Sequence, residues 1–337
     1  MKFLPKILAY TLAVLVTSLE ANEPPEASST VWKYRLNGFS ETDYQQAVEA
    51  LFKAWEQKND LRPGPKGKIG LKVYTNSGPG LATPRPLVRS VIDALVKRGW
   101  QRENIFILDL NERLLRKSGF LPKLSQGGSD FDGVPVYALE SEEYFDPKWY
   151  YESPLPSSAL QFFPPEITSN TATALEEDRK SFLPVPLLLE ADLWINLPVV
   201  TDHPALGISG TLANATVWNI SNYRRFLLNP ANAPVAIAEI AAIPELQRSW
   251  AFTLVTLERY QFIGGPAFNF LYTHSEPALW LSANPVALDY LIYSKINQDR
   301  IRNNFKPIEP EPLWFQYSKT LGLGNYTAET IQQITLP

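Results

Sequence analysis

The stretch KIGLKVYTN at residues 68–76, taken with the segments that follow it, decides the fold. Its apolar run predicts a buried strand, and the glycine- and proline-rich SGPGLATPRP at 77–86 predicts a turn. LVRSVIDALVKRG at 87–99 has apolar residues at helical spacing, and NIFILDL at 104–110 reads as a second strand. This strand–helix–strand order is typical of parallel sheets. We therefore predict an α/β fold with a mostly parallel sheet and flanking helices.

Regular segments on both sides of this unit extend the pattern. We predict a helix at 40–57, strands at 191–200 and 249–257, and a helix at 284–297. Ser40 can cap the first helix, with Asp43 three residues on. Asn284 can cap the last helix, with Pro285 at its first position.

The chain divides by composition into several parts. We predict a signal peptide at 1–21, a linker and N-terminal helix at 22–66, an α/β domain at 67–304 with an irregular aromatic- and proline-rich insertion at 121–181, and a proline-rich C-terminal tail at 305–337.

The N-terminus has the pattern of a secretory signal. Lys2 and Lys6 precede a short apolar stretch, and Ala21 stands at a possible cleavage site. An uncleaved N-terminal anchor is the alternative. Because no later segment has the length and apolarity of a spanning helix, we expect an exported soluble protein, secreted or periplasmic in a bacterial envelope.

Composition restricts the chemistry. The formal net charge is -4, which gives no general attraction to nucleic acid, so no nucleic-acid partner is expected. The absence of cysteine excludes disulfides, thiolate nucleophiles and an iron–sulfur cluster. The identity of any other cofactor and the oligomeric state stay open.

Three loops follow predicted strands, at 75–85, 200–211 and 261–269. In open parallel sheets, ligands bind outside the carboxyl ends of the strands, so these loops are expected to share one rim. A structure in which they are unrelated turns is the alternative.

The first loop contains Asn76 and Gly80 and leads into a predicted helix. Glycine lets the backbone approach a ligand, and the free N–H groups of a helix start favour an anion. Thr83 is a plausible cap with Pro84 at the first helical position, and Arg85 could add positive charge. A tight turn with an ordinary cap is the alternative.

The second loop contains Asp202 and His203. Imidazole titrates near neutrality, so His203 is a candidate for acid–base work or metal binding, and Asp202 could orient it or bind a cation. A surface histidine in a turn is an equally weighted alternative. Ser209 lies in a sequence that only loosely resembles a nucleophile elbow.

The third loop contains Gly264, Gly265 and Pro266, which allow an unusual backbone path near a ligand. His274 and Glu276 follow it. A zinc site that combines His203, His274 and a carboxylate is chemically possible, and whether a metal is bound stays open.

Four segments occur in an order that resembles the bacterial family called domain of unknown function 362. These are GLKVYTN with ATPRPLVRSVIDALVKRGWQRENIFILD, then ADLWINLPVVTDHPALGISGTLANAT, IGGPAFN, and LWLSANPVALDYLIYSKIN. The resemblance covers about residues 68–297 and matches poorly over 121–181. It departs at Thr201, at 215–216 and at Asn284, where the family has lysine, a lysine–asparagine pair and aspartate.

The resemblance implies site residues. Lys72 matches the early lysine of the family, His203 its histidine, and Gly265 with Pro266 its glycine–proline loop. The late motif is matched by Ser282, Pro285, Val286, Ala287 and Asp289. Many relatives carry a ferredoxin-like cluster segment, which a chain without cysteine cannot hold.

Two functions are consistent with these features. The first is binding or catalysis on a small, anionic molecule, with charge from Lys72 and Arg85, proton or metal chemistry from His203 and Asp202, and ligand contacts from Asn76, Gly80, Gly264, Gly265, Pro266, Ser282 and Asp289. The second is a non-catalytic envelope protein for binding or interaction, in which the loss of family lysines marks an eroded site.

Overall fold

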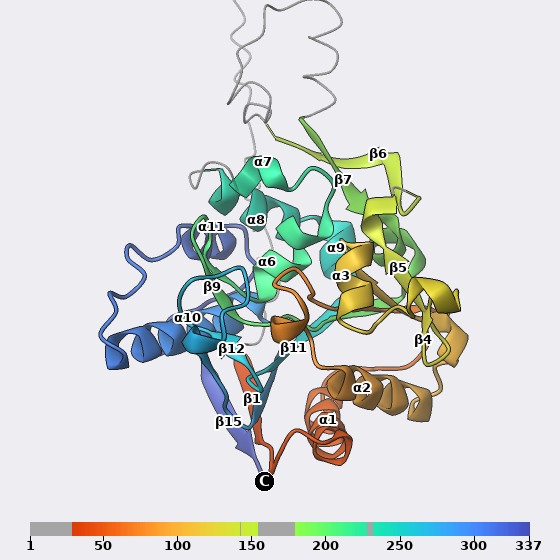
Figure 1. Ribbon diagram of the computed structural model, residues 1–337, viewed down its shortest axis with the longest axis horizontal. Coiled ribbons are helices and arrows are strands. Elements are labelled where there is room, and N and C mark those ends of the chain that lie inside the picture. The colour runs from red at the N-terminus through yellow and green to blue at the C-terminus, as the bar shows by residue number, and fades with distance from the viewer. Residues whose placement is uncertain (1–28, 142, 154–178, 228–231) are drawn as a thin grey trace, which may run out of the picture.

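The computed structural model describes residues 29–141, 143–153, 179–227 and 232–337 (Figure 1). The predicted signal peptide and much of the predicted insertion lie outside these residues. Within them, no helix is long and apolar enough to cross a membrane.

A nine-stranded mixed sheet forms the centre, in the order β15-β1-β14-β11-β8-β2-β3-β5-β4. Its strands are β1 (Thr30–Arg35), β2 (Ile69–Lys72), β3 (Ile105–Asp109), β4 (Asp130–Phe131), β5 (Val134–Ala138), β8 (Leu193–Asn196), β11 (Trp250–Thr256), β14 (Ala278–Ser282) and β15 (Gln332–Leu336). Five neighbouring strands, from β11 to β5, are all parallel, while β14 and β4 run antiparallel to their central neighbours. The predicted α/β class with a mostly parallel sheet is confirmed.

Helices cover both faces of the sheet (Figure 1). They are α1 (Glu41–Glu56), α2 (Arg85–Lys97), α3 (Glu112–Lys117), α6 (Thr211–Ala215), α7 (Arg224–Leu227), α8 (Ala233–Ala241), α9 (Pro244–Ser249), α10 (Pro285–Arg302) and α11 (Trp314–Thr320). Strand β3 shows why both faces are apolar. Ile105 and Ile107 pack into the core with α1 and α2, whereas Phe106 and Leu108 pack into the core with α6, α8 and α10. Strands buried on both faces are expected in the centre of a parallel sheet.

Two smaller sheets complete the fold. One contains β9 (Thr201–His203), β10 (Gly207–Ser209), β12 (Tyr260–Gln261) and β13 (Thr273–His274), and the other pairs β6 (Phe145–Glu152) with β7 (Lys180–Pro184). The first of these sheets joins the predicted second and third loops, because β9 and β12 pair in parallel through Thr201 and Gln261.

The helix ends test the predicted caps. Ser40 forms a capping box with Asp43, and Asn284 accepts a hydrogen bond from the Ala287 amide, as predicted. The prediction for α2 is wrong, because this helix begins at Arg85 and has no side-chain cap. The Thr83 hydroxyl donates instead to the carbonyl oxygen of Leu197 at 2.7 Å, and Leu197 is the residue that directly follows β8.

The structure also differs from the predicted divisions at the sheet margins. Residues 30–35 of the predicted linker form β1, and residues 332–336 of the predicted tail form β15 beside it. Residues 134–138 of the predicted insertion form β5, which pairs in parallel with β3.

Candidate functional site

The carboxyl ends of the parallel strands define a natural place for a ligand. From β2 the chain moves outward to β3 and β5, then returns to β8 and β11 on the other side of β2. The strand order therefore reverses between β2 and β8. In doubly wound α/β proteins, ligands bind in the crevice at this reversal point.

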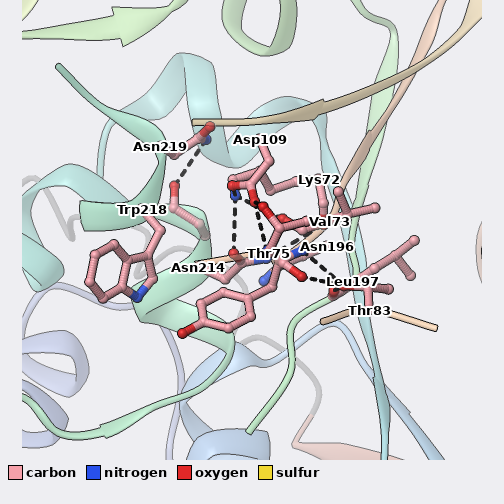
Figure 2. Close-up of polar contacts among 12 residues, drawn as sticks. Lys72, Val73, Thr75, Thr83, Asp109, Asn196, Leu197, Asn214, Trp218 and Asn219 are labelled. Carbon is pink, nitrogen blue, oxygen red and sulfur yellow. Dashed lines mark hydrogen bonds and ion pairs between the residues drawn. The ribbon is translucent and has the colours of Figure 1, made fainter. Parts of the chain in front are cut away.

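A buried polar cluster lies at the carboxyl ends of β2, β3 and β8, next to this reversal point (Figure 2). The Lys72 ammonium is fully buried and donates to Asp109 at 2.6 Å, to Asn214 at 3.0 Å and to the Val73 carbonyl at 2.9 Å. Asn214 in turn donates to Asn196 at 2.8 Å. Burial lowers the pKa of Lys72, and the nearby Asp109 carboxylate acts in the opposite direction and raises it. Three acceptors match the three ammonium N–H groups, so Lys72 has no donor left for a ligand.

Asp109 is satisfied from the other side by the loop that follows β2. Its second oxygen accepts from the Thr75 amide and the Thr75 hydroxyl, each at 2.7 Å. The cluster thus ties the ends of β2, β3 and β8 together. Asp109, Asn196 and Asn214 were missed by the sequence analysis, although the first two are the last residues of their strands.

Asp202 holds the third loop in place. Its carboxylate accepts the Gly264 amide at 3.0 Å and the Gly265 amide at 2.8 Å, and Arg300 lies 3.4 Å away. The peptide bond between Gly265 and Pro266 is cis. A side chain at Gly265 would collide with the Asp202 backbone oxygen, so this close approach requires glycine. Burial raises the pKa of Asp202, and the two amides oppose that effect.

His203 does not interact with Asp202. Successive residues of a strand point to opposite faces, so the two side chains diverge from β9. The His203 Nδ1 atom accepts the Ala205 amide at 3.1 Å, and the ring packs edge-on against Trp218. Burial lowers the pKa of His203 to about 4. The ring is therefore neutral at pH 7 with its proton on Nε2, and it is poorly suited to accept a proton.

Asp289 and Ser282 also make internal contacts. Asp289 accepts the Thr211 amide at 2.6 Å and the Leu212 amide at 2.9 Å, at the start of α6, and burial raises its pKa to about 6. Ser282 donates to the Thr30 carbonyl and accepts the Asn284 amide. The residues of the late motif thus fasten α10 to α6 and β14 to β1.

Hydrogen bonds join the three predicted loops to one another. The Phe268 amide of the third loop donates to the Ser77 carbonyl of the first at 3.3 Å, and Asp202 of the second binds the third. Asn76 keeps a buried amide nitrogen without a partner among the described residues.

A polar cavity of about 260 Å³ opens beside the first loop. It is lined by Pro79, Gly80, Ala82, Thr83, Pro84, Arg85, Pro86, Lys117, Ser118, Val199, Glu258 and Arg259. These residues follow β2, β3, β8 and β11 in the chain, so the cavity lies at the carboxyl edge and next to the reversal point. Gly80 and Arg85 were predicted for such a site; Lys117 and Arg259 were not.

The cavity is cationic. Among the described residues, neither Arg85 nor Lys117 has a carboxylate partner. Arg259 donates to the Gly80 carbonyl at 2.8 Å. The one acidic side chain in the lining is Glu258, which accepts a hydrogen bond from Tyr44 at 2.7 Å. The Ser118 hydroxyl is buried and has no described partner.

The start of α2 adds backbone donors to this cavity. The helix has no side-chain cap, and the first N–H groups of any helix lack partners within it. Pro86 has no N–H, which leaves the amides of Arg85 and Leu87. Together with the side-chain cations they make an environment that favours a bound anion.

A metal centre has less support. No group of three or more histidine or acidic side chains lies close enough together to hold a metal ion in the described residues. His203 and His274 stand on β9 and β13, which are separated by β12. The His274 ring is 3.5 Å from Asp299, on α10. The combination of the two histidines proposed from the sequence is thus not assembled.

Fold and cavity together define an α/β protein with a doubly wound parallel centre and a cationic cavity at its carboxyl edge. No family model and no curated protein matches the chain. Among solved structures, a structural-genomics protein of Thermotoga maritima is similar at 12% identity with a TM-score of 0.43. That similarity covers 80% of this chain and 60% of the other, so the chain spans less than two thirds of that protein.

Proposed function

We propose that the chain binds a small anionic molecule in the cavity lined by Arg85, Lys117 and Arg259. The observation that carries the proposal is that these three cations and the uncapped start of α2 surround one cavity at the reversal point of the sheet. The volume of about 260 Å³ suits a compact ligand, such as a phosphate ester or a small carboxylic acid.

The proposal is for binding, and the internal contacts of the candidate catalytic residues support that choice. Lys72, Asp202 and Asp289 use their charged groups to hold other parts of the chain, and His203 is neutral with one nitrogen already bonded. Catalysis on the bound molecule would need a reactive side chain in the cavity, and Glu258 and Ser118 are the candidates in its lining.

Titration calorimetry with inorganic phosphate and simple phosphate monoesters tests the proposal. Arg85→Gln should weaken binding about tenfold or more, because a hydrogen bond to a charged group contributes about 1.5–3 kcal/mol. The matched control is Arg113→Gln, since Arg113 is an exposed arginine of α3 outside the cavity lining. Equal losses in both variants would show general electrostatic attraction and refute a specific site.

Export and kinship with the domain of unknown function 362 family belong to the proposal as well. The charged start and short apolar stretch at 1–21 support export. Mass spectrometry of protein expressed with its own N-terminus tests it, and a mature chain that still begins at Met1 would contradict signal cleavage. The order of the matching segments between 68 and 297 supports the kinship.

A further inference from the structure

An apolar tip projects from the loop between β12 and β13. Phe270 and Leu271 are adjacent there, and their side chains are 73% and 78% exposed. Single exposed apolar residues are common on protein surfaces, but two neighbouring ones at this exposure need an explanation. Leu124 is the comparable case elsewhere, at 79%, and it stands alone in a short turn.

The tip is held firmly by hydrogen bonds. The Gln261 side chain accepts the Asn269 amide at 2.7 Å and donates to the Ala267 carbonyl at 2.9 Å. The Asn269 side chain accepts the Leu271 amide at 3.1 Å. The backbone therefore fixes the two apolar side chains in solvent when a looser loop could turn them inward.

The tip adjoins the cationic cavity. Phe268, two residues before Phe270, lies against Gly80, where an added side-chain carbon would be 2.2 Å from the ring. The Arg259 guanidinium lies 5.8 Å from the centre of the same ring and also binds the Gly80 carbonyl. Gly80 and Arg259 line the cavity, so Phe268 places the apolar tip beside the cavity without making it part of the lining.

We infer that this face docks on the surface of a bilayer that contains anionic lipids. Phe270 and Leu271 enter the boundary between headgroups and acyl chains, while Arg259, Arg85 and Lys117 face lipid phosphates. The headgroup part of this inference rests on the proposed anion site, and the apolar part rests on the tip alone. In interfacial helices, apolar side chains enter the boundary between headgroups and acyl chains while basic side chains contact anionic headgroups, and the same two kinds of side chain are adjacent here.

Charge gives the docking its direction. The whole chain carries a formal net charge of -4, so an anionic surface repels most of the molecule. Only a local cationic face can turn toward such a surface. A stable protein partner would need about 800 Å² on each side, and a two-residue tip is small for that purpose.

Sedimentation with vesicles of phosphatidylcholine, alone or mixed with phosphatidylglycerol, tests the inference. The protein should bind the mixed vesicles, and Phe270→Ser combined with Leu271→Ser should weaken binding at least about tenfold, from the apolar area lost. Leu124→Ser is the matched control and should bind as the wild type does. Arg259→Gln should weaken binding to mixed vesicles about fivefold and leave binding to pure phosphatidylcholine unchanged.

Two further measurements separate this inference from the proposed function. The tip variant should bind inorganic phosphate like the wild type, since neither residue lines the cavity. Phosphate binding without vesicle binding would overturn docking and leave the anion site intact. Tip-dependent vesicle binding that ignores phosphatidylglycerol would overturn the cationic part. Self-association that the tip variant abolishes, without vesicle binding, would make the tip a protein contact and overturn the inference.

Discussion

Two polar regions meet at the carboxyl edge of the same strands, and they differ in what their charges contact. In the buried cluster, Lys72 is surrounded by Asp109, Asn214 and a backbone carbonyl. In the cavity, Arg85 and Lys117 form no ion pair with a carboxylate among the described residues. The charge of Lys72 in the cluster is neutralised by groups of the protein itself, whereas the charges of Arg85 and Lys117 in the cavity are available to a ligand. A polar residue at a strand end is thus a weak sign of function until its partners are known.

The largest expected effect comes from removing the buried cation. Lys72→Met should destabilise the fold by about 3–5 kcal/mol, because it leaves the Asp109 carboxylate buried without its partner. Urea unfolding measures this loss. Lys68→Met is the matched control, since the Lys68–Glu190 pair is about 40% exposed and should contribute about 1 kcal/mol or less. Similar losses in both variants would show that the buried cluster is not special.

Two internal titratable groups should give opposing pH effects on stability. Burial raises the pKa of Asp289 to about 6, so the folded state keeps a proton that the unfolded state releases near pH 4. Stability from this group falls as pH rises from about 4 to about 6. Burial lowers the pKa of His203 to about 4. Between about pH 4 and pH 6.5, His203 is therefore protonated in the unfolded state and neutral in the folded state. Stability from that group rises over nearly the same range.

The two contributions offset each other in the wild type, and single variants should separate them. Asp289→Asn should make stability rise more steeply with pH between about 4 and 6, and His203→Asn should make it fall, each by up to about 3 kcal/mol across the range. Unfolding curves at several pH values measure both. Profiles parallel to the wild type would mean that neither group has a shifted pKa. Asparagine at 203 retains an acceptor for the Ala205 amide, whereas at 289 it replaces one of two carboxylate acceptors with an NH2 group. The slope of stability against pH, which a constant loss of stability does not change, is therefore the quantity to compare.

A smaller effect is expected where the two regions join. Thr83 lines the cavity, yet its hydroxyl accepts the Tyr74 amide and donates to the Leu197 carbonyl. Thr83→Val should cost about 1–3 kcal/mol by leaving those buried groups unpaired. Thr83→Ser retains the hydroxyl and should cost clearly less. If the two variants unfold at the same urea concentration, the hydroxyl has no such role.

The smallest effect on stability is expected in the cavity itself. Arg85→Gln and Lys117→Gln should each change the free energy of unfolding by about 0.5 kcal/mol or less, because the side chains have no charged partner to lose. The same urea titration measures this. A loss above about 1 kcal/mol would mean that Arg85 and Lys117 stabilise the fold as Lys72 does, and the difference between the buried cluster and the cavity would disappear.

Much of the fold could be predicted from local pattern. Residues 68–110 contain a strand, a glycine turn, a helix and a strand in close succession, and the parallel centre follows from them. The edge strands could not be predicted in the same way. Residues 30–35 and 332–336 are short and partly exposed, and they become strands only because distant segments pair with them.

The candidate site was harder to predict because it depends on where each side chain points, which the position of a residue in the sequence does not determine. The rule about parallel strands predicted that the three loops share one rim, and hydrogen bonds do join the loops. The same rule could not predict that Asp202 and His203, neighbours in sequence, point away from each other. Arg259 follows β11 closely and could have been found by the same rule. Lys117 could not, since it comes at the end of α3 and reaches the cavity only through the packing of that helix.

The position of β1 in the sheet imposes an order on biosynthesis. Its two neighbours are β14 and β15, and bonds from Thr30 reach residues 252 and 302 positions further along the chain. The ribosome synthesises β1 early and its partner strands much later, so both edges of β1 remain unpaired during most of translation. Contacts of such long sequence separation form slowly, and unpaired edges favour aggregation. A nascent chain of this protein therefore has a long interval in which a chaperone that covers β1 would be useful.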